Sequence, residues 1–331
     1  MARYGSPLAC FGLFDNSVAQ ASIAVQCIQL VFLALILTTW AVAQRKTPHQ
    51  FEVLKWRNFG LAMVFWLIYA IFGFIEFFLL GCSLDFTLAD SYRLSIVAHI
   101  LHWIALALTL AAVLLAIPRG FDRLRDPTTA LTTRSTWTLA SRLLLGLFTL
   151  FTIVYLCLFV WAYQSAIDTY NSDRWSSYST TSLSAFPQYI YVYMALTTTW
   201  FVLLLATAIK SLQSLRHAAA SWRVSRALKA WTWALALALF AWGALMTFFA
   251  FWDALGVYVW PYSSSYLAQN VCELVLITFF MLLALLAVVQ VAKGVSAMLA
   301  HPDLYAVRRK ENGTGRDVEA DVQVVHDGVV H

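Results

Sequence analysis

Charged side chains are scarce in this sequence. Asp, Glu, Lys and Arg together make up 12% of the 331 residues, whereas apolar types make up 61%, and the mean hydropathy is +0.71. Soluble domains carry about 25% charged and roughly 45–50% apolar residues. The composition therefore excludes an ordinary soluble domain and favours a protein whose main solvent is lipid hydrocarbon.

Motifs that would indicate a metal, a nucleic acid or secretion are also missing. The five cysteines show neither a CxxC pair nor a zinc-type spacing. The net charge of +5 is not gathered into one basic stripe, so no nucleic-acid partner is expected. The first apolar segment is too long for the core of a cleavable signal peptide. We assign no cofactor.

Long apolar stretches are what the sequence has instead. A spanning helix needs roughly 20 mostly apolar residues, and seven stretches qualify: 18–43, 57–82, 92–117, 138–163, 188–212, 230–258 and 266–292. We predict an all-α polytopic membrane protein, a seven-transmembrane helix bundle over 18–292, with an N-terminal segment 1–17 and a largely disordered tail 293–331. All seven prolines lie outside these stretches, and Pro118 and Pro187 are predicted to mark a helix end and a helix start.

The basic residues predict the orientation of the bundle. Cytosolic loops of multi-pass proteins are enriched in Lys and Arg. All but three of the 22 basic residues lie in the predicted segments 44–57, 118–142, 210–229 and 293–331. We therefore predict an N-out, C-in protein of the plasma membrane or an endomembrane, in contact with the lipid bilayer. The basic cytosolic loops offer a surface for a cytosolic protein partner.

Polar residues within the predicted spans form the candidate site. Ionisable groups in a membrane are costly and are a first hypothesis for a functional site. Acids, histidines and amides gather in the outer half of the spans: Gln26, Gln29, Glu76, His99, His102, Asp253, Gln269, Asn270 and Glu273. The inner halves hold no acid or histidine, so the pattern predicts an outward-facing polar vestibule that is closed towards the cytosol.

Two readings of these residues remain open. A buried Glu or His also serves as a hydrogen-bonding link between helices, and Glu76 and His99 are expected to be neighbours because a short loop joins their helices. His99 and His102 lie three residues apart and are weak candidates for a metal site. Because no further ligand can be named, we assign no metal and no catalytic residue.

Two features of the predicted outer face have alternative interpretations. Cys10 and Cys82 both lie there, where an oxidising compartment permits a disulfide, and two free thiols fit equally well. The segment 164–187 is rich in Ser, Thr and Tyr and is followed by a run of tyrosines. This region is either a solvated loop with an interfacial aromatic belt or a lid over a ligand site.

The leading functional hypothesis is a receptor-like or sensory protein whose outer pocket binds a small or amphipathic ligand. A transporter of a small solute or lipid is the alternative, followed by an intramembrane metal-dependent hydrolase and by a purely accessory role. The predicted bundle is similar to G-protein-coupled receptors in helix number and orientation alone. The inner end of the predicted helix 92–117 lacks an acid-Arg-Tyr triplet, and 266–292 lacks Asn-Pro-x-x-Tyr, so no family is assigned.

Overall fold

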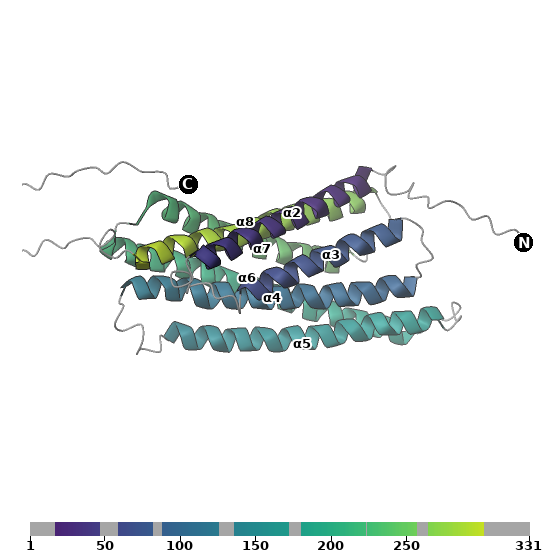
Figure 1. Ribbon diagram of the computed structural model, residues 1–331. Coiled ribbons are helices and arrows are strands. Elements are labelled where there is room, and N and C mark those ends of the chain that lie inside the picture. The colour runs from purple at the N-terminus through teal and green to yellow at the C-terminus, as the bar shows by residue number, and fades with distance from the viewer. Residues whose placement is uncertain are drawn as a thin grey trace, which may run out of the picture.

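The computed structural model describes residues 17–46, 59–81, 88–125, 136–171, 180–222, 224–256 and 264–300. Within these ranges the protein is all-α. Seven helices lie alongside one another (Figure 1), and their bounds are α2 (Ser17–Lys46), α3 (Leu61–Gly81), α4 (Leu88–Arg125), α5 (Thr136–Asn171), α6 (Thr180–Ser221), α7 (Arg226–Gly256) and α8 (Ser264–Ala300).

Six of these helices are long and apolar enough to cross a bilayer. On α2, α4, α5, α6, α7 and α8 the apolar stretches have between 26 and 32 residues and a mean hydropathy between 1.8 and 2.8. A helix suits hydrocarbon because it satisfies its own backbone hydrogen bonds. The prediction of a multi-pass membrane protein is thereby confirmed. The apolar stretch described on α3, Leu61–Glu76, is shorter than the other six.

The lipid-facing surface is strongly apolar. Large aliphatic side chains point outward on α2 and α5, among them Val31, Leu35, Leu139, Leu143 and Leu150. A soluble monomer rarely exposes a continuous apolar surface of this kind. In a bilayer these side chains meet acyl chains, so contact with lipid explains their exposure.

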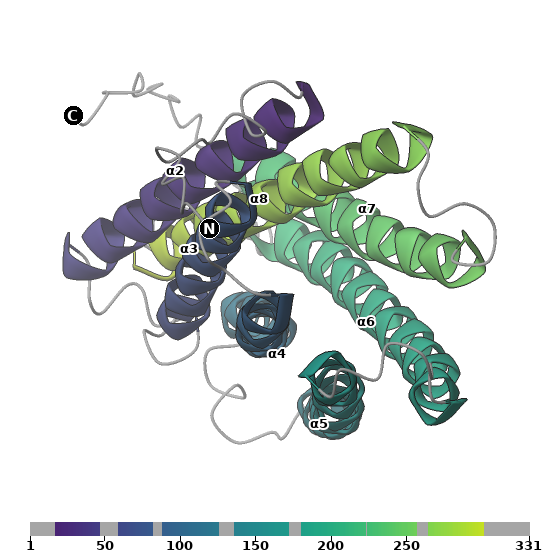
Figure 2. The ribbon, with the colours of Figure 1, turned by 90° about the vertical axis from the view of Figure 1, so that its right-hand side faces the viewer.

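α4 is the central helix of the bundle. It packs against α3, α5, α6 and α8, and the end-on view shows it inside the arc formed by the other helices (Figure 2). Its apolar stretch is 53% buried, compared with 17% on α2 and 22% on α5. A residue on α4 can therefore contact several helices at once, whereas most side chains of α2 and α5 face lipid.

The helix boundaries correct the two proline predictions. α4 continues through Pro118 to Arg125, and α6 begins at Thr180 and contains Pro187. A proline has no backbone N–H, so it leaves the carbonyl four residues earlier without its usual partner. For Pro118 that carbonyl belongs to Leu114, and it accepts a hydrogen bond from Nε1 of Trp137 on α5 at 3.4 Å. A neighbouring helix thus compensates for the missing donor.

Several helices also run beyond the predicted spans. α5 continues to Asn171 and α6 starts at Thr180, so much of the predicted outer loop 164–187 is helical. At 1.5 Å per residue the 42 residues of α6 extend over about 63 Å, roughly twice the ~30 Å hydrocarbon core. Hydropathy marks the part of a helix that lies in lipid, but helical hydrogen bonding continues past that boundary.

The packed interior satisfies most of its hydroxyl groups within single helices. Buried Ser and Thr side chains donate to the carbonyl four residues earlier, as in Thr109, Thr152, Thr207, Ser211 and Thr232. This pattern is a common way for a hydroxyl to be accommodated in a helix without water. Such hydroxyls are already paired and do not make the interior of the bundle a polar site.

Candidate functional site

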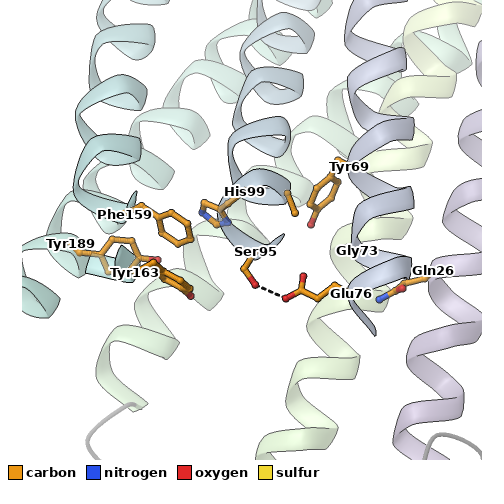
Figure 3. Close-up of a pocket in the computed structure, with 10 residues that line it drawn as sticks. Gln26, Tyr69, Gly73, Glu76, Ser95, His99, Phe159, Tyr163 and Tyr189 are labelled. Carbon is orange, nitrogen blue, oxygen red and sulfur yellow. Dashed lines mark hydrogen bonds between the residues drawn. The ribbon is translucent and has the colours of Figure 1, made fainter. Parts of the chain in front are cut away.

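A cavity of about 410 Å³ lies between five helices and is partly open to the surface. It is located near the end of the bundle at which α2, α4 and α6 begin. Its lining residues come from α2, α3, α4, α5 and α6 (Figure 3): Gln26, Tyr69, Gly73, Glu76, Ser95, Ala98, His99, Phe159, Tyr163 and Tyr189. The cavity therefore combines one carboxylate, one imidazole, one amide and several aromatic rings.

Helical periodicity explains why these residues share one space. Tyr69, Gly73 and Glu76 follow one another at intervals of four and three residues, which places them on one face of α3. Ser95 and His99 are four residues apart on α4 and face the cavity in the same way. Gly73 has no side chain, and a Cβ atom built there would meet no heavy atom within 4 Å. The absence of a side chain at residue 73 keeps this wall of the cavity open.

The carboxylate of Glu76 links two helices across the cavity. Ser95 Oγ on α4 donates a hydrogen bond to Glu76 Oε1 on α3 (Figure 3). Tyr69, about two turns before Glu76, lies within electrostatic range of both Glu76 and Glu273. Glu273 is partly buried on α8. Two acids on different helices therefore act electrostatically on the same tyrosine.

Phe159, Tyr163 and Tyr189, on α5 and α6, form the aromatic wall of the cavity. His99 connects this wall to α4. Its Nε2 atom is 2.6 Å from the hydroxyl of Tyr155, which is 3.2 Å from the hydroxyl of Tyr189. The imidazole also stacks on Phe159, with ring centroids 4.2 Å apart and an interplanar angle of 12°. These contacts join α4, α5 and α6 and fix the orientation of the imidazole at the cavity surface.

His102 lies one turn deeper and does not line the cavity. Its ring makes a T-shaped contact with Trp66 and a tilted contact with Tyr69, with centroid distances of 5.2 Å and 4.7 Å. Among the residues that the structure describes, its buried Nδ1 atom has no hydrogen-bond partner. His102 is therefore part of the aromatic packing below the cavity rather than of its surface.

The structure brings together three of the residues that the sequence singled out, Gln26, Glu76 and His99. Glu76 and His99 line one cavity, but each has its own partner: Glu76 accepts a bond from Ser95, and His99 pairs with Tyr155. Neither bond joins the acid to a histidine, but both run between different helices, so each residue also serves as the hydrogen-bonding link that the sequence left open.

The other predicted site residues lie elsewhere or outside the described part. Gln29 is buried on α2, one turn beyond Gln26. Asp253 belongs to α7, and Gln269 and Asn270 belong to α8, but their side chains fall outside the described residues. Cys10 and Cys82, the predicted disulfide, also lie outside them. The cavity is therefore lined by α2, α3, α4, α5 and α6 alone among the described residues.

The part of the aromatic wall that α5 contributes was not predicted from the sequence. Tyr155, Phe159 and Tyr163 recur every four residues along α5, so they form one stripe. The tyrosine run near the start of α6 divides by the same rule, because Tyr189 lines the cavity whereas Tyr191 is 69% exposed. Helical spacing of the aromatic residues on α5 is the signal that could have identified them.

Within the described part of the chain, no three His, Cys, Asp or Glu side chains gather as metal ligands. The chemistry that the cavity offers is recognition by a carboxylate, hydroxyl groups and aromatic faces. Comparisons of this chain with protein-family models, with curated proteins and with solved structures give no match.

Proposed function

We propose that this protein is a receptor-like or sensory membrane protein with seven spans, oriented N-out and C-in, and that its cavity binds a small or amphipathic ligand from the outer side. The observation that carries the proposal is the cavity of about 410 Å³ between α2 and α6, with Glu76 and His99 in its wall. Ligand pockets commonly measure about 300–1,000 Å³ and combine aromatic walls with a few polar groups. The cavity has both properties.

The count of seven spans and the orientation are part of this proposal. α3 lies between α2 and α4 and packs against both, which supports counting it as a span. With seven crossings the two ends of the chain lie on opposite sides of the membrane. The basic residues of the connecting segments then favour a cytosolic C-terminus, so the cavity opens outward.

α4 supplies a physical route from the cavity to the cytosolic side. Its first half carries Ser95 and His99, and its last turn carries Leu124, whose carbonyl accepts a bond from Trp222 Nε1 at 2.6 Å. Trp222 follows α6 and precedes α7. A ligand that shifts α4 would thus act on the α6–α7 connection, where basic residues can meet a cytosolic partner. This arrangement supports a receptor-like role.

A cavity-filling substitution tests the binding proposal. In Gly73→Leu the added side chain enters the cavity without meeting a neighbouring atom at its Cβ, so the fold should persist while the space is lost. Gly146→Leu is the matched control, because a Cβ at this exposed position on α5 also meets nothing within 4 Å. The assay is thermal stabilisation of the purified protein in neutral detergent by a panel of small amphipathic compounds.

Compounds that stabilise the wild type should lose their effect on Gly73→Leu and retain it on Gly146→Leu. A saturating ligand at 100 times its Kd should contribute about 2.7 kcal/mol, which makes the loss readily measurable. Equal stabilisation of all three proteins would contradict the proposal, since the compounds would then bind outside the cavity.

A second measurement separates a receptor-like role from transport. An environment-sensitive fluorophore at Arg226→Cys, in a background without the native cysteines, reports on the α6–α7 connection next to Trp222. A stabilising compound should change its emission in the wild-type cavity but not with Gly73→Leu. Accumulation of the compound inside sealed vesicles that contain the protein, with no change in emission, would favour the transporter instead.

A further inference from the structure

We infer that the ligand is an amphipathic organic cation, with its ammonium group at Glu76 and its apolar body along the aromatic wall formed by Phe159, Tyr163 and Tyr189. This inference rests on the proposed function and adds the chemical class of the ligand. It is carried by the charge of the lining residues and by the way in which the carboxylate and the rings are separated around α4.

The charge of the cavity favours a cation. Of the lining residues that the structure describes, Glu76 is the one carboxylate, and none is Lys or Arg. Its partner in the described part of the chain is a neutral hydroxyl, that of Ser95. A carboxylate held within a membrane protein is costly unless an opposite charge balances it. An ammonium group of the ligand supplies that charge, whereas an anion would be repelled.

The charged residues nearest to the cavity do not oppose a cation. Glu273 on α8, a second acid, acts electrostatically on Tyr69, as Glu76 does. The basic residue of α4 nearest to Ser95 in the sequence is Arg93, which is exposed and does not line the cavity. Charge in solvent is screened much more strongly than charge inside the bundle.

The aromatic wall suits the apolar part of the same molecule. Phe159 lies 4.3 Å from Tyr163 and 5.7 Å from Tyr189, measured between ring centroids, so the three rings form one continuous surface. Figure 3 shows these rings on one side of Ser95 and Glu76 on the other. A ligand that is charged at one end and apolar at the other matches this division. Ring faces also attract a cation that approaches them.

A pair of isosteric probes tests the charge requirement. Benzyltrimethylammonium and neopentylbenzene have nearly the same shape, but only the first carries a positive charge. Their binding to the full chain, purified in neutral detergent, is measured by calorimetric titration. We expect the cation to bind at least about tenfold more tightly than the neutral probe, and Glu76→Gln to remove about that factor for the cation alone.

Two variants make the result specific to the cavity. Asp168→Asn is the control for lost negative charge, because Asp168 is exposed on α5, pairs with Gln164 and does not line the cavity. It should leave the binding of both probes unchanged. Gly73→Leu fills the cavity and should abolish the binding of both.

The outcomes separate this inference from the proposed function. Equal affinity for the two probes, both lost in Gly73→Leu, would overturn the cation while leaving the ligand cavity in place. Binding of both probes that Gly73→Leu leaves unchanged would overturn the cavity itself. If Glu76→Gln does not fold, two results still test the cation preference: the ratio of the two affinities in the wild type, and the loss of binding of both probes in Gly73→Leu. No measurable binding of the cation to the wild type would also overturn the inference.

Discussion

The contact between α6 and α7 provides a sharp test of the packing, because the two helices approach closely at Gly243. A Cβ atom built there would lie 2.9 Å from Phe201 Cδ2 and 3.2 Å from Phe201 Cα. The Cα atom belongs to the backbone, so it cannot move away unless the helices separate. Overpacking of this kind costs about 1–3 kcal/mol, against a gain of roughly 0.5–1 kcal/mol when Ala replaces Gly in a helix. Gly243→Ala should therefore destabilise the protein, by about 1 kcal/mol from the middle of these two ranges.

Gly73→Ala is the matched substitution with the opposite expected sign. No heavy atom lies within 4 Å of a Cβ at this position, so the helix-propensity gain of roughly 0.5–1 kcal/mol is not offset. Gly294→Ala should fall between the two, because its 2.8 Å contact is with the flexible end of Leu228, Cδ1.

The assay is the fraction of monodisperse protein that survives heating in neutral detergent, followed by size-exclusion chromatography. Each kcal/mol should shift the midpoint by about 2–4 °C, the scale of soluble domains of 150–250 residues. A Gly243→Ala midpoint equal to that of the wild type, or midpoint shifts of Gly243→Ala and Gly73→Ala in the same direction, would contradict the close approach of α6 and α7 at Gly243.

Two further predictions follow from individual contacts, and a third follows from the distribution of basic residues. Tyr155→Phe removes the hydroxyl that bonds to His99 and Tyr189. The stability should fall by about 1–3 kcal/mol, measured as a lower midpoint of thermal unfolding. An unchanged midpoint would contradict these hydrogen bonds. Trp137→Phe should lower the stability by about 1 kcal/mol because the Leu114 carbonyl loses its donor. The loss should be smaller in a Pro118→Ala background, because residue 118 then regains a backbone N–H. Equal losses in both backgrounds would contradict this compensation. A reporter fused after His331 should read as cytosolic and a tag near Ser177 as external, and the reverse labelling by an impermeant reagent would overturn the orientation.

The apolar stretches were predictable because the bilayer imposes their length and composition. The helix ends were not, and Pro118 shows why. The rule that proline ends a helix assumes that the orphaned carbonyl finds no other partner. Here the partner is Trp137, on a different helix. Local sequence does not say which side chain of a neighbouring helix will reach a given carbonyl, so the exception depends on the tertiary structure.

The site was predictable to the extent that polarity in a membrane is costly. That cost singled out Glu76, His99 and Gln26, which line one cavity. It gave no signal for the α5 wall, because aromatic residues are as acceptable in lipid as in a pocket. Phe159 is buried and Trp161, two residues later, is 52% exposed. The residue type alone therefore does not tell whether an aromatic ring faces lipid or the cavity. For Phe159 the spacing of four residues from Tyr155 and from Tyr163 does so.

Whether Glu76 serves structure or function can be decided by removing its charge alone. Its bond from Ser95 links α3 to α4, but a glutamine carbonyl would accept the same bond without a charge to desolvate. Glu76→Gln should therefore change the thermal stability by less than about 1 kcal/mol while it weakens the binding of benzyltrimethylammonium. Ser95→Ala, which keeps the charge and removes its hydrogen-bond donor, should be the more destabilising of the two. A large loss of stability in Glu76→Gln with unchanged probe binding would instead identify the acid as a structural link between helices.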